Sequence, residues 1–289
     1  MTIPLHDDRG VAFRFAAPPA RIVSLVPSDT YTLQELGVGD RLVGRTDYCL
    51  AEEVEAVGGT KNADVARILE LSPDVVIANQ EENRRVDIER LEAAGVPVFV
   101  SFPQTVRQGL DVARRLAQLL GVAGLVEVVG LFDELEAKLT ELEAAPSDPV
   151  PTFVPIWMDP LMTVHGDTFI SDVLELVGGR NVFSDRERRY PLRADLGLVP
   201  AVPTPEGRDT RYPRVTLAEV EARAPELILL PDEPHAFTPE DAAVFEALHV
   251  PAAGGGIHFC DGKDLMWYGL RALHGLDRLR RLLDEARIR

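Results

Sequence analysis

Apolar stretches of two kinds alternate along most of the chain. Short β-branched runs such as Ile22–Val26 and Val75–Ala78 predict buried strands, and each is followed by apolar residues at helical spacing. Strands that alternate with helices in this way are typical of a parallel sheet covered by helices on both faces. The pattern therefore predicts an α/β fold.

The expected elements of the first half lie in residues 21–121, an N-terminal α/β lobe. Strands are expected at Ile22–Val26, Leu42–Gly44, Val75–Ala78 and Pro97–Phe102, and helices at Thr30–Leu36, Asp64–Leu71, Arg85–Ala94 and Thr105–Leu120. Residues 1–20 come before this lobe. They alternate around Asp8-Arg9-Gly10, which predicts a hairpin-like arm.

Residues 122–146 follow a different pattern and predict one long linking helix. Its apolar positions recur at helical spacing, namely Leu125, Val128, Phe132, Leu135, Leu139 and Leu142. At 1.5 Å per residue such a helix is about 35 Å long, enough to pass from one lobe to another. The prolines of Pro146-Ser147-Asp148-Pro149 end the pattern.

Residues 147–289 repeat the alternation and form the expected C-terminal α/β lobe. Strands are expected at Thr152–Trp157 and Leu227–Leu230, and helices at Thr168–Leu176, Thr216–Arg223, Pro239–Leu248 and Lys263–Ala286. The segment 192–212 has no periodicity and is rich in Pro, Arg and Gly. We interpret it as an inserted surface loop and expect it to be mobile, as long irregular loops often are.

One pattern occurs twice. Residues 64–77 align without a gap on residues 216–229, and both copies predict a capped helix, a proline and then a strand. Only an alanine and the proline are identical, so duplication of one unit and convergence on the same pattern both explain the similarity. With the long helix, the pattern predicts two Rossmann-like lobes joined by one backbone helix, with a ligand cleft between the lobes.

Composition excludes some classes of function. The 289 residues carry 30 Lys and Arg against 47 Asp and Glu, a net charge of −17, which argues against nucleic acid as a partner. No stretch approaches 18 apolar residues, so the chain is not expected to be embedded in a membrane. The N-terminus lacks a signal-peptide pattern, which predicts a cytoplasmic protein as written, or a periplasmic or cell-envelope protein if the chain is a processed form.

Candidate ligand-binding residues follow from the positions of the strands. In open α/β sheets, ligands bind beyond the carboxyl ends of the strands, where loops and helix N-termini converge. The aromatic and polar residues there suit a large planar ligand, although the aromatic side chains would also serve simply to close the cores. The predicted ligand-binding residues are Pro27, Ser28, Asp29, Tyr48, Lys61, Asn79, Gln80, Phe102, Trp157, Glu233, Phe237, Met266, Trp267 and Tyr268.

Catalytic chemistry has little support, because none of the common nucleophile, zinc or phosphate-loop motifs is present. We therefore predict no catalytic residues. An alternative hypothesis is a cytoplasmic metal-binding protein or metal-dependent enzyme, with His165, His235 and Glu233 as ligands. A weaker one is an interaction protein whose loop 192–212 orders on contact with a partner. Cys49 and Cys260 form no metal-ligand spacing, and the sequence leaves open whether Cys49 binds metal.

Five blocks of sequence carry a family resemblance. They begin RIVSLVPSDTYTLQELG, VGGTKNADVARILELSPDVVIANQ, IWMDPLMTVHGDTFISDVLELVGG, LLPDEPHAF and DGKDLMWYG. In order and spacing they resemble the helical-backbone (class III) substrate-binding proteins of ABC importers, in the cobalamin-binding branch. The resemblance implies two lobes bridged by one long helix, a bound corrinoid, haem or iron–siderophore, no reaction, no required cofactor, and a transporter permease as partner.

The chain also departs from that family in its surface charges and in its cleft. By the resemblance, the acidic residues that dock on the transporter fall here on Ala66 and Ala218, with Asp64 and Glu219 nearby. Asn79 stands where some cobalamin-binding members place a tryptophan. The missing acidic residues concern whether the protein docks on a transporter, and the missing tryptophan concerns which ligand it binds.

Overall fold

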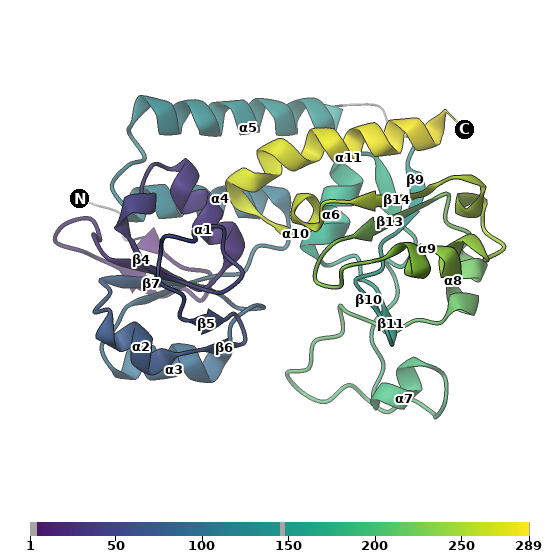
Figure 1. Cartoon of the computed structure of the whole chain (residues 1–289), viewed down its shortest axis with the longest axis horizontal. Coiled ribbons are helices and arrows are strands. Elements are labelled where there is room, and N and C mark those ends of the chain that lie inside the picture. Colours follow the sequence, from purple (N-terminus) through teal and green to yellow (C-terminus); the bar gives the residue numbers. More distant parts are fainter. Residues whose placement is uncertain (1–4, 145–147, 289) are drawn as a thin grey trace. The chain divides into compact units, whose positions relative to one another are not determined.

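The computed structural model describes residues 5–144 and 148–288. The chain divides into two compact units, the first formed by Met1–Ala137 with Trp267–Arg271 and the second by Lys138–Met266 with Ala272–Arg289. Each unit contains one four-stranded parallel sheet with helices packed around it (Figure 1). The predicted α/β fold is thus confirmed.

The sheet of the first unit has the strand order β4-β3-β7-β8, and all its pairs are parallel. Its strands are β3 (Ile22–Ser24), β4 (Leu42–Arg45), β7 (Val75–Asn79) and β8 (Val98–Ser101). The covering helices are α1 (Pro27–Glu35), α2 (Val65–Glu70), α3 (Arg85–Ala93) and α4 (Val106–Leu119). Helices α2 and α3 pack against each other, as do α1 and α4, on the two faces of this sheet (Figure 1).

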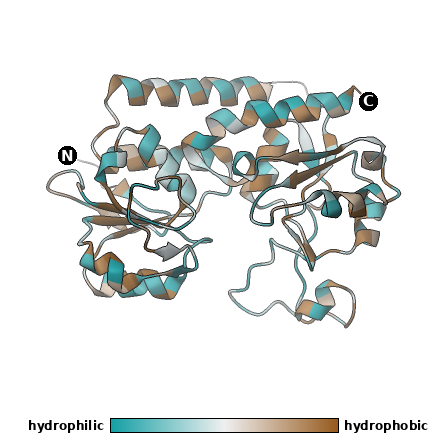
Figure 2. Cartoon of the chain, viewed as in Figure 1, coloured by the Kyte–Doolittle hydropathy of each residue, from teal (hydrophilic) through white to brown (hydrophobic). Residues whose placement is uncertain are grey.

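The sheet of the second unit has the order β12-β9-β13-β14, which is the same connectivity as in the first unit. Its strands are β9 (Val150–Phe153), β12 (Gly179–Asn181), β13 (Leu227–Pro231) and β14 (Ile257–Cys260). The helices of this unit are α6 (Phe169–Leu176), α7 (Leu192–Asp195), α8 (Leu217–Arg223), α9 (Pro239–Glu246), α10 (Gly262–Met266) and α11 (Ala272–Arg287). The strands of both sheets are mostly hydrophobic, because they are buried between layers of helices. The helices around them are amphipathic (Figure 2).

The repeated sequence pattern has a structural counterpart in both units. Asp64 and Thr216 each cap a helix by accepting a backbone N–H three residues on. Ser72 and Ala224, at matching positions before the proline, both take left-handed backbone conformations with φ of 49° and 46°. The strands that follow, β7 and β13, occupy the same place in their sheets.

Helix α5 (Val126–Ala144) confirms that residues 122–146 contain one long helix, although it begins later than predicted and residues 145–147 lie outside the described residues. Its buried positions include Val128, Phe132, Leu135 and Leu139. The division between the two units falls within it, between Ala137 and Lys138. Among the described helices, none combines the length and apolar character needed to cross a bilayer.

The expected helix over Lys263–Ala286 is wrong in one respect, because the structure breaks it into α10 and α11. Between them, Trp267–Arg271 belongs to the first unit rather than to the C-terminal lobe. Gly269 has a φ of +78°, which is incompatible with continuing a helix. The expected strand Thr152–Trp157 is also shorter, because Trp157 belongs to a small hairpin of β10 (Trp157–Met158) and β11 (Leu161–Met162).

The segment 192–212 is not the structureless loop that its composition suggested. It contains the helical turn α7, and the buried guanidinium of Arg186 is 3.0 Å from the Asp195 carboxylate at its end. The second carboxylate oxygen of Asp195 accepts the backbone N–H of Arg214 at 2.7 Å. These contacts join residues 9 and 19 positions apart, and helical or strand periodicity gave no sign of them.

Candidate functional site

In the first unit, several predicted residues meet at the carboxyl ends of the strands. The hydroxyl of Tyr268 donates to a carboxylate oxygen of Asp29 at 2.8 Å and lies 2.8 Å from the hydroxyl of Ser101. The side-chain amide of Asn79 donates to both hydroxyls, at 3.2 Å each. Asp29, Asn79, Ser101 and Tyr268 are all buried, so three predicted residues and Ser101, which was not predicted, form an internal polar network.

Local sequence places two of these groups. Pro27 occupies the first turn of α1, where its missing N–H costs nothing, and Asp29 follows in the same turn. Asn79 ends β7, and its side-chain oxygen accepts the backbone N–H groups of Glu81 and Glu82. That turn-forming role is common for asparagine after a strand.

Burial governs the electrostatics of this network. Removal from water raises the pKa of Asp29 to about 7; the hydrogen bond from Tyr268 opposes this rise, and the nearby charge of Asp8 adds to it. The second carboxylate oxygen of Asp29 has no hydrogen-bond partner among the described residues. Burial likewise raises the pKa of Tyr268 well above its ordinary value. At neutral pH the Asp29 carboxyl group is therefore partly protonated, and Tyr268 keeps its proton.

The predicted ligand-binding residues of the first unit divide into two groups. Five are buried, namely Ser28, Asp29, Asn79, Trp267 and Tyr268. Tyr48, Lys61 and Gln80 are exposed, and Pro27 and Phe102 are partly exposed. The buried group holds the Trp267–Arg271 segment in place, so we assign any ligand contact in this unit to the accessible group.

In the second unit, the loops after β9 and β13 bring aromatic rings together. The indole of Trp157, which is 43% exposed, lies with its centroid 5.6 Å from the imidazole of His235. His235 in turn packs edge-on against buried Phe237 at 4.6 Å. The rings thus run from the surface into the core, where Phe245 follows. Of the other predicted residues of this unit, Glu233 and Met266 are partly buried.

The imidazole of His235 has a defined partner. Its Nε2 lies 3.2 Å from a carboxylate oxygen of Asp241, whose pKa is lowered by the backbone N–H of Thr238 and by His235 itself. If Nε2 carries the proton, Nδ1 keeps a lone pair available to a metal centre. A carboxylate-oriented histidine is a common arrangement behind a metal-bound imidazole.

A protein-only metal site finds no support. Within residues 5–144 and 148–288, no group of three or more His, Cys, Asp or Glu side chains is placed to hold an ion. The Nδ1 of His165 accepts the backbone N–H of Asp167 at 3.0 Å. Cys49 is buried between the hydroxyls of Thr30 and Thr46, and burial raises the pKa of its thiol.

A hollow of about 300 Å³ lies elsewhere in the first unit, between the N-terminal arm and the start of β8. Its lining includes Phe13, Phe15, Glu92, Pro97 and Val98. None of the predicted ligand-binding residues lines it, so this hollow and the strand-end loops are separate features.

Comparison with known proteins decides the family. The family described as periplasmic binding protein matches residues 22–241. The chain belongs to this family. Among its curated relatives, the Vitamin B12-binding protein of Photorhabdus laumondii is 30% identical over 181 residues, which make up 61% of this chain and 65% of that protein. The aligned region of this periplasmic binding protein thus spans just under two thirds of that relative.

Solved structures agree with the fold of a periplasmic binding protein. The vitamin B12 binding protein BtuF of Vibrio cholerae has a TM-score of 0.73 at 20% identity, covering 94% of this chain and 99% of that chain. The haem-binding protein RhuT from Roseiflexus sp. RS-1 has a TM-score of 0.73 at 19% identity with the same coverage. At these identities the likeness shows a shared fold.

Sequence reasoning missed three residues of this periplasmic binding protein that organise the loops. Ser101 ends β8 and could have been found as a polar residue at a strand end. Asp241 sits in the capping box of α9 with Thr238, a recognisable spacing. Asp8 gave no local signal, because its partners lie far along the chain.

Proposed function

We propose that this periplasmic binding protein binds a large planar metal chelate, a corrinoid, haem or iron–siderophore, and carries out no reaction on it. The family and the names of its relatives support this class of ligand. A chelate of this kind presents a flat apolar face and a metal centre, so it needs an aromatic platform and a donor atom.

The observation that carries the proposal is the contact of Trp157 with His235 at the strand ends of the second unit. The half-exposed indole offers a flat apolar surface. The adjacent imidazole, oriented by Asp241, offers a nitrogen to the metal of the chelate. On this basis we propose that His235 contacts the metal of the cargo, in place of a metal site made by protein side chains alone.

The first unit has accessible predicted residues of its own. Tyr48 is 66% exposed, and Lys61 and Gln80 are also exposed. The Nζ of Lys61 donates to the backbone oxygen of Glu81, which connects the turns that contain Lys61 and Gln80. We keep these residues as the predicted polar ligand contacts of the first unit.

The proposal includes a membrane transporter as partner and the periplasm as location, both by extension from the family. Ala66 on α2 and Ala218 on α8 are exposed and carry no charge. The neighbouring carboxylates already have partners within the chain. Asp64 caps α2, and Glu219 accepts hydrogen bonds from Thr216 and Arg186. Docking through carboxylates at these two positions is therefore not part of the proposal.

Titration of the purified protein with cyanocobalamin, cobinamide and haemin, followed by visible absorption, tests the proposal. We expect at least one ligand to bind with a Kd well below millimolar and to change its spectrum. Trp157→Ala should weaken that binding by about tenfold, since loss of a stacking ring costs on the order of 1 kcal/mol or more. His235→Ala should remove the change in the metal's absorption bands.

Phe259→Ala provides the matched control, because Phe259 is also a half-exposed aromatic side chain of the second unit but lies outside the predicted set. Its binding should equal that of the unmodified protein. Equal losses in the Trp157 and Phe259 variants would contradict the assigned surface, and binding to none of the three ligands would contradict the ligand class.

A further inference from the structure

Among the described residues, β8 is the last strand of its sheet, so no strand pairs with its outer edge. A short turn of the N-terminal arm takes the place of one. Arg9 donates to the backbone oxygen of Val98 at 2.7 Å, and Asp8 N–H donates to the oxygen of Val100 at 3.1 Å. The Asp7 carboxylate accepts the N–H of Val100 at 3.2 Å. Residues 7–9 therefore provide hydrogen-bond partners for backbone groups at the edge of β8, as a paired strand would.

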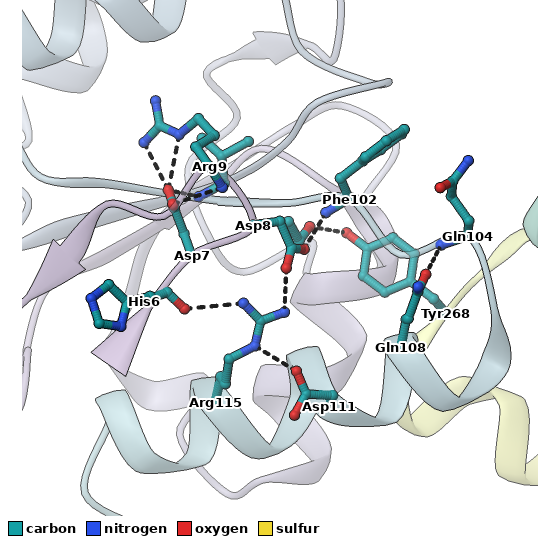
Figure 3. A network of polar contacts seen from close by, with 12 residues as sticks. His6, Asp7, Asp8, Arg9, Phe102, Gln104, Gln108, Asp111, Arg115 and Tyr268 are labelled. Atoms are coloured by element: carbon teal, nitrogen blue, oxygen red, sulfur yellow. Dashed lines mark hydrogen bonds and ion pairs between the residues drawn. The ribbon is translucent and has the colours of Figure 1, made fainter. Parts of the chain in front are cut away.

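Asp8 reaches one step further along this edge than the other two residues. Its carboxylate accepts the backbone N–H of Phe102 at 2.5 Å, just beyond the end of β8 (Figure 3). The other carboxylate oxygen accepts a guanidinium N–H of Arg115 at 2.7 Å. Arg115 is itself fixed, because it donates to the backbone oxygen of His6 and pairs with Asp111. The acceptor for Phe102 is thus held rigidly.

The loop that begins at Phe102 is consequently anchored at both ends. Asp8 holds the N–H of Phe102, and the side chain of Gln108 accepts the N–H of Gln104 at 2.7 Å. Ser101, immediately before the loop, contacts the hydroxyl of Tyr268. Residues Ser101 and Phe102 at the end of β8 therefore connect the N-terminal turn with the buried polar network of the first unit.

We propose that Asp8 is a positioning residue for the ligand-binding loop Phe102–Gln104. This role deepens the proposed function and rests on it, since Phe102 is a predicted ligand contact. Charge-assisted hydrogen bonds are stronger than neutral ones, so the carboxylate restricts the loop more than a backbone partner would. A loop held in its binding geometry loses less entropy when a ligand arrives.

A comparison of Asp8→Ala with Arg9→Ala distinguishes positioning of the loop from general stabilisation of the strand edge. Arg9→Ala removes a side-chain contact to Val98 in β8, whereas Asp8→Ala removes the contact to Phe102 beyond the end of that strand. Hydrogen exchange followed by mass spectrometry, with haemin and cyanocobalamin titrations, compares them. Asp8→Ala should speed exchange of the Phe102 amide by about tenfold and weaken ligand binding by about fivefold. Arg9→Ala should leave both unchanged.

Asp8→Asn keeps an acceptor oxygen without the charge and should give intermediate values in both measurements. It also serves if the alanine variant fails to fold. Unchanged exchange at Phe102 in both Asp8 variants would overturn the positioning role, whether or not a ligand binds. Equal loss of affinity in Arg9→Ala would overturn it too. If no ligand binds the unmodified protein, the proposed function fails, while the exchange comparison still decides the role of Asp8.

Discussion

At the scale of single residues, Asp29 is a buried carboxyl group whose pKa is raised. It was predicted from its loop position to contact a ligand, and the structure buries it to 1% exposure beside Tyr268. A carboxyl group placed there is stable when protonated, because burial of the ionised form costs solvation energy that one hydrogen bond does not restore. The residue thus links the protonation state to the folding of its unit.

Stability should depend on pH through Asp29. Its pKa in the folded protein is raised from 3.8 to about 7. The protonated Asp29 carboxyl group therefore contributes fully to the free energy of unfolding below about pH 4. This contribution, about 4 kcal/mol, is lost as the pH rises through 7. Asp29→Asn should flatten the dependence of urea stability on pH between 5 and 8.

The control for this measurement is Asp40→Asn, which removes an exposed carboxyl group from the same unit. It should leave the pH dependence of the unmodified protein in place. A profile for Asp29→Asn that matches this control would show that Asp29 does not titrate in the expected range.

At the scale of elements, the two copies of the helix–proline–strand pattern end their helices in the same way. Ser72 and Ala224 adopt the left-handed conformation that favours glycine, with the proline immediately after. A residue with a Cβ atom is strained there by about 1 kcal/mol. Both units therefore contain a strained residue shortly before a central strand, β7 or β13.

Replacing these residues with glycine should relieve that strain. Ser72→Gly and Ala224→Gly are each expected to raise the free energy of unfolding by about 0.5–1 kcal/mol, as measured by urea denaturation. Ala222→Gly, inside helix α8, should instead lower it by about 1 kcal/mol. Destabilisation by all three variants would mean that the left-handed conformation is not a source of strain.

At the scale of the whole molecule, the chain passes between the units at three points, once within α5 and twice around Trp267–Arg271. The latter segment is fixed in the first unit by Tyr268 and by the backbone N–H of Leu270, which donates to Thr32 at 3.4 Å. Gly269 lets the backbone approach, because a Cβ atom there would lie 2.5 Å from the hydroxyl oxygen of Thr32.

Gly269→Ala should therefore loosen this segment. Both the positive φ and the clash oppose a side chain, so the urea midpoint should fall by the equivalent of about 2 kcal/mol or more. Gly254→Ala is the matched control, since a Cβ atom at Gly254 meets nothing within 4 Å and its φ is not positive. Similar midpoints for the two variants would contradict the role assigned to Gly269.

The candidate site was only partly visible in the sequence. The rule that ligands gather at strand ends selected Trp157 and Phe237, and the structure connects these two through His235. The same rule selected Asp29 and Tyr268, which contact each other but are buried. Position along a strand predicts proximity; whether a side chain faces solvent depends on which distant segment covers it.

The sequence by itself determined the alternation of strands and helices, the long helix and the repeated pattern, because these depend on periodicity, caps and prolines close along the chain. The tertiary structure alone decided the strand orders, the break around Gly269, the anchoring of loop 192–212 by Arg186 and the contact of Asp8 with Phe102. Each of these depends on contacts between residues far apart in sequence, where burial and hydrogen bonding outweigh local propensity.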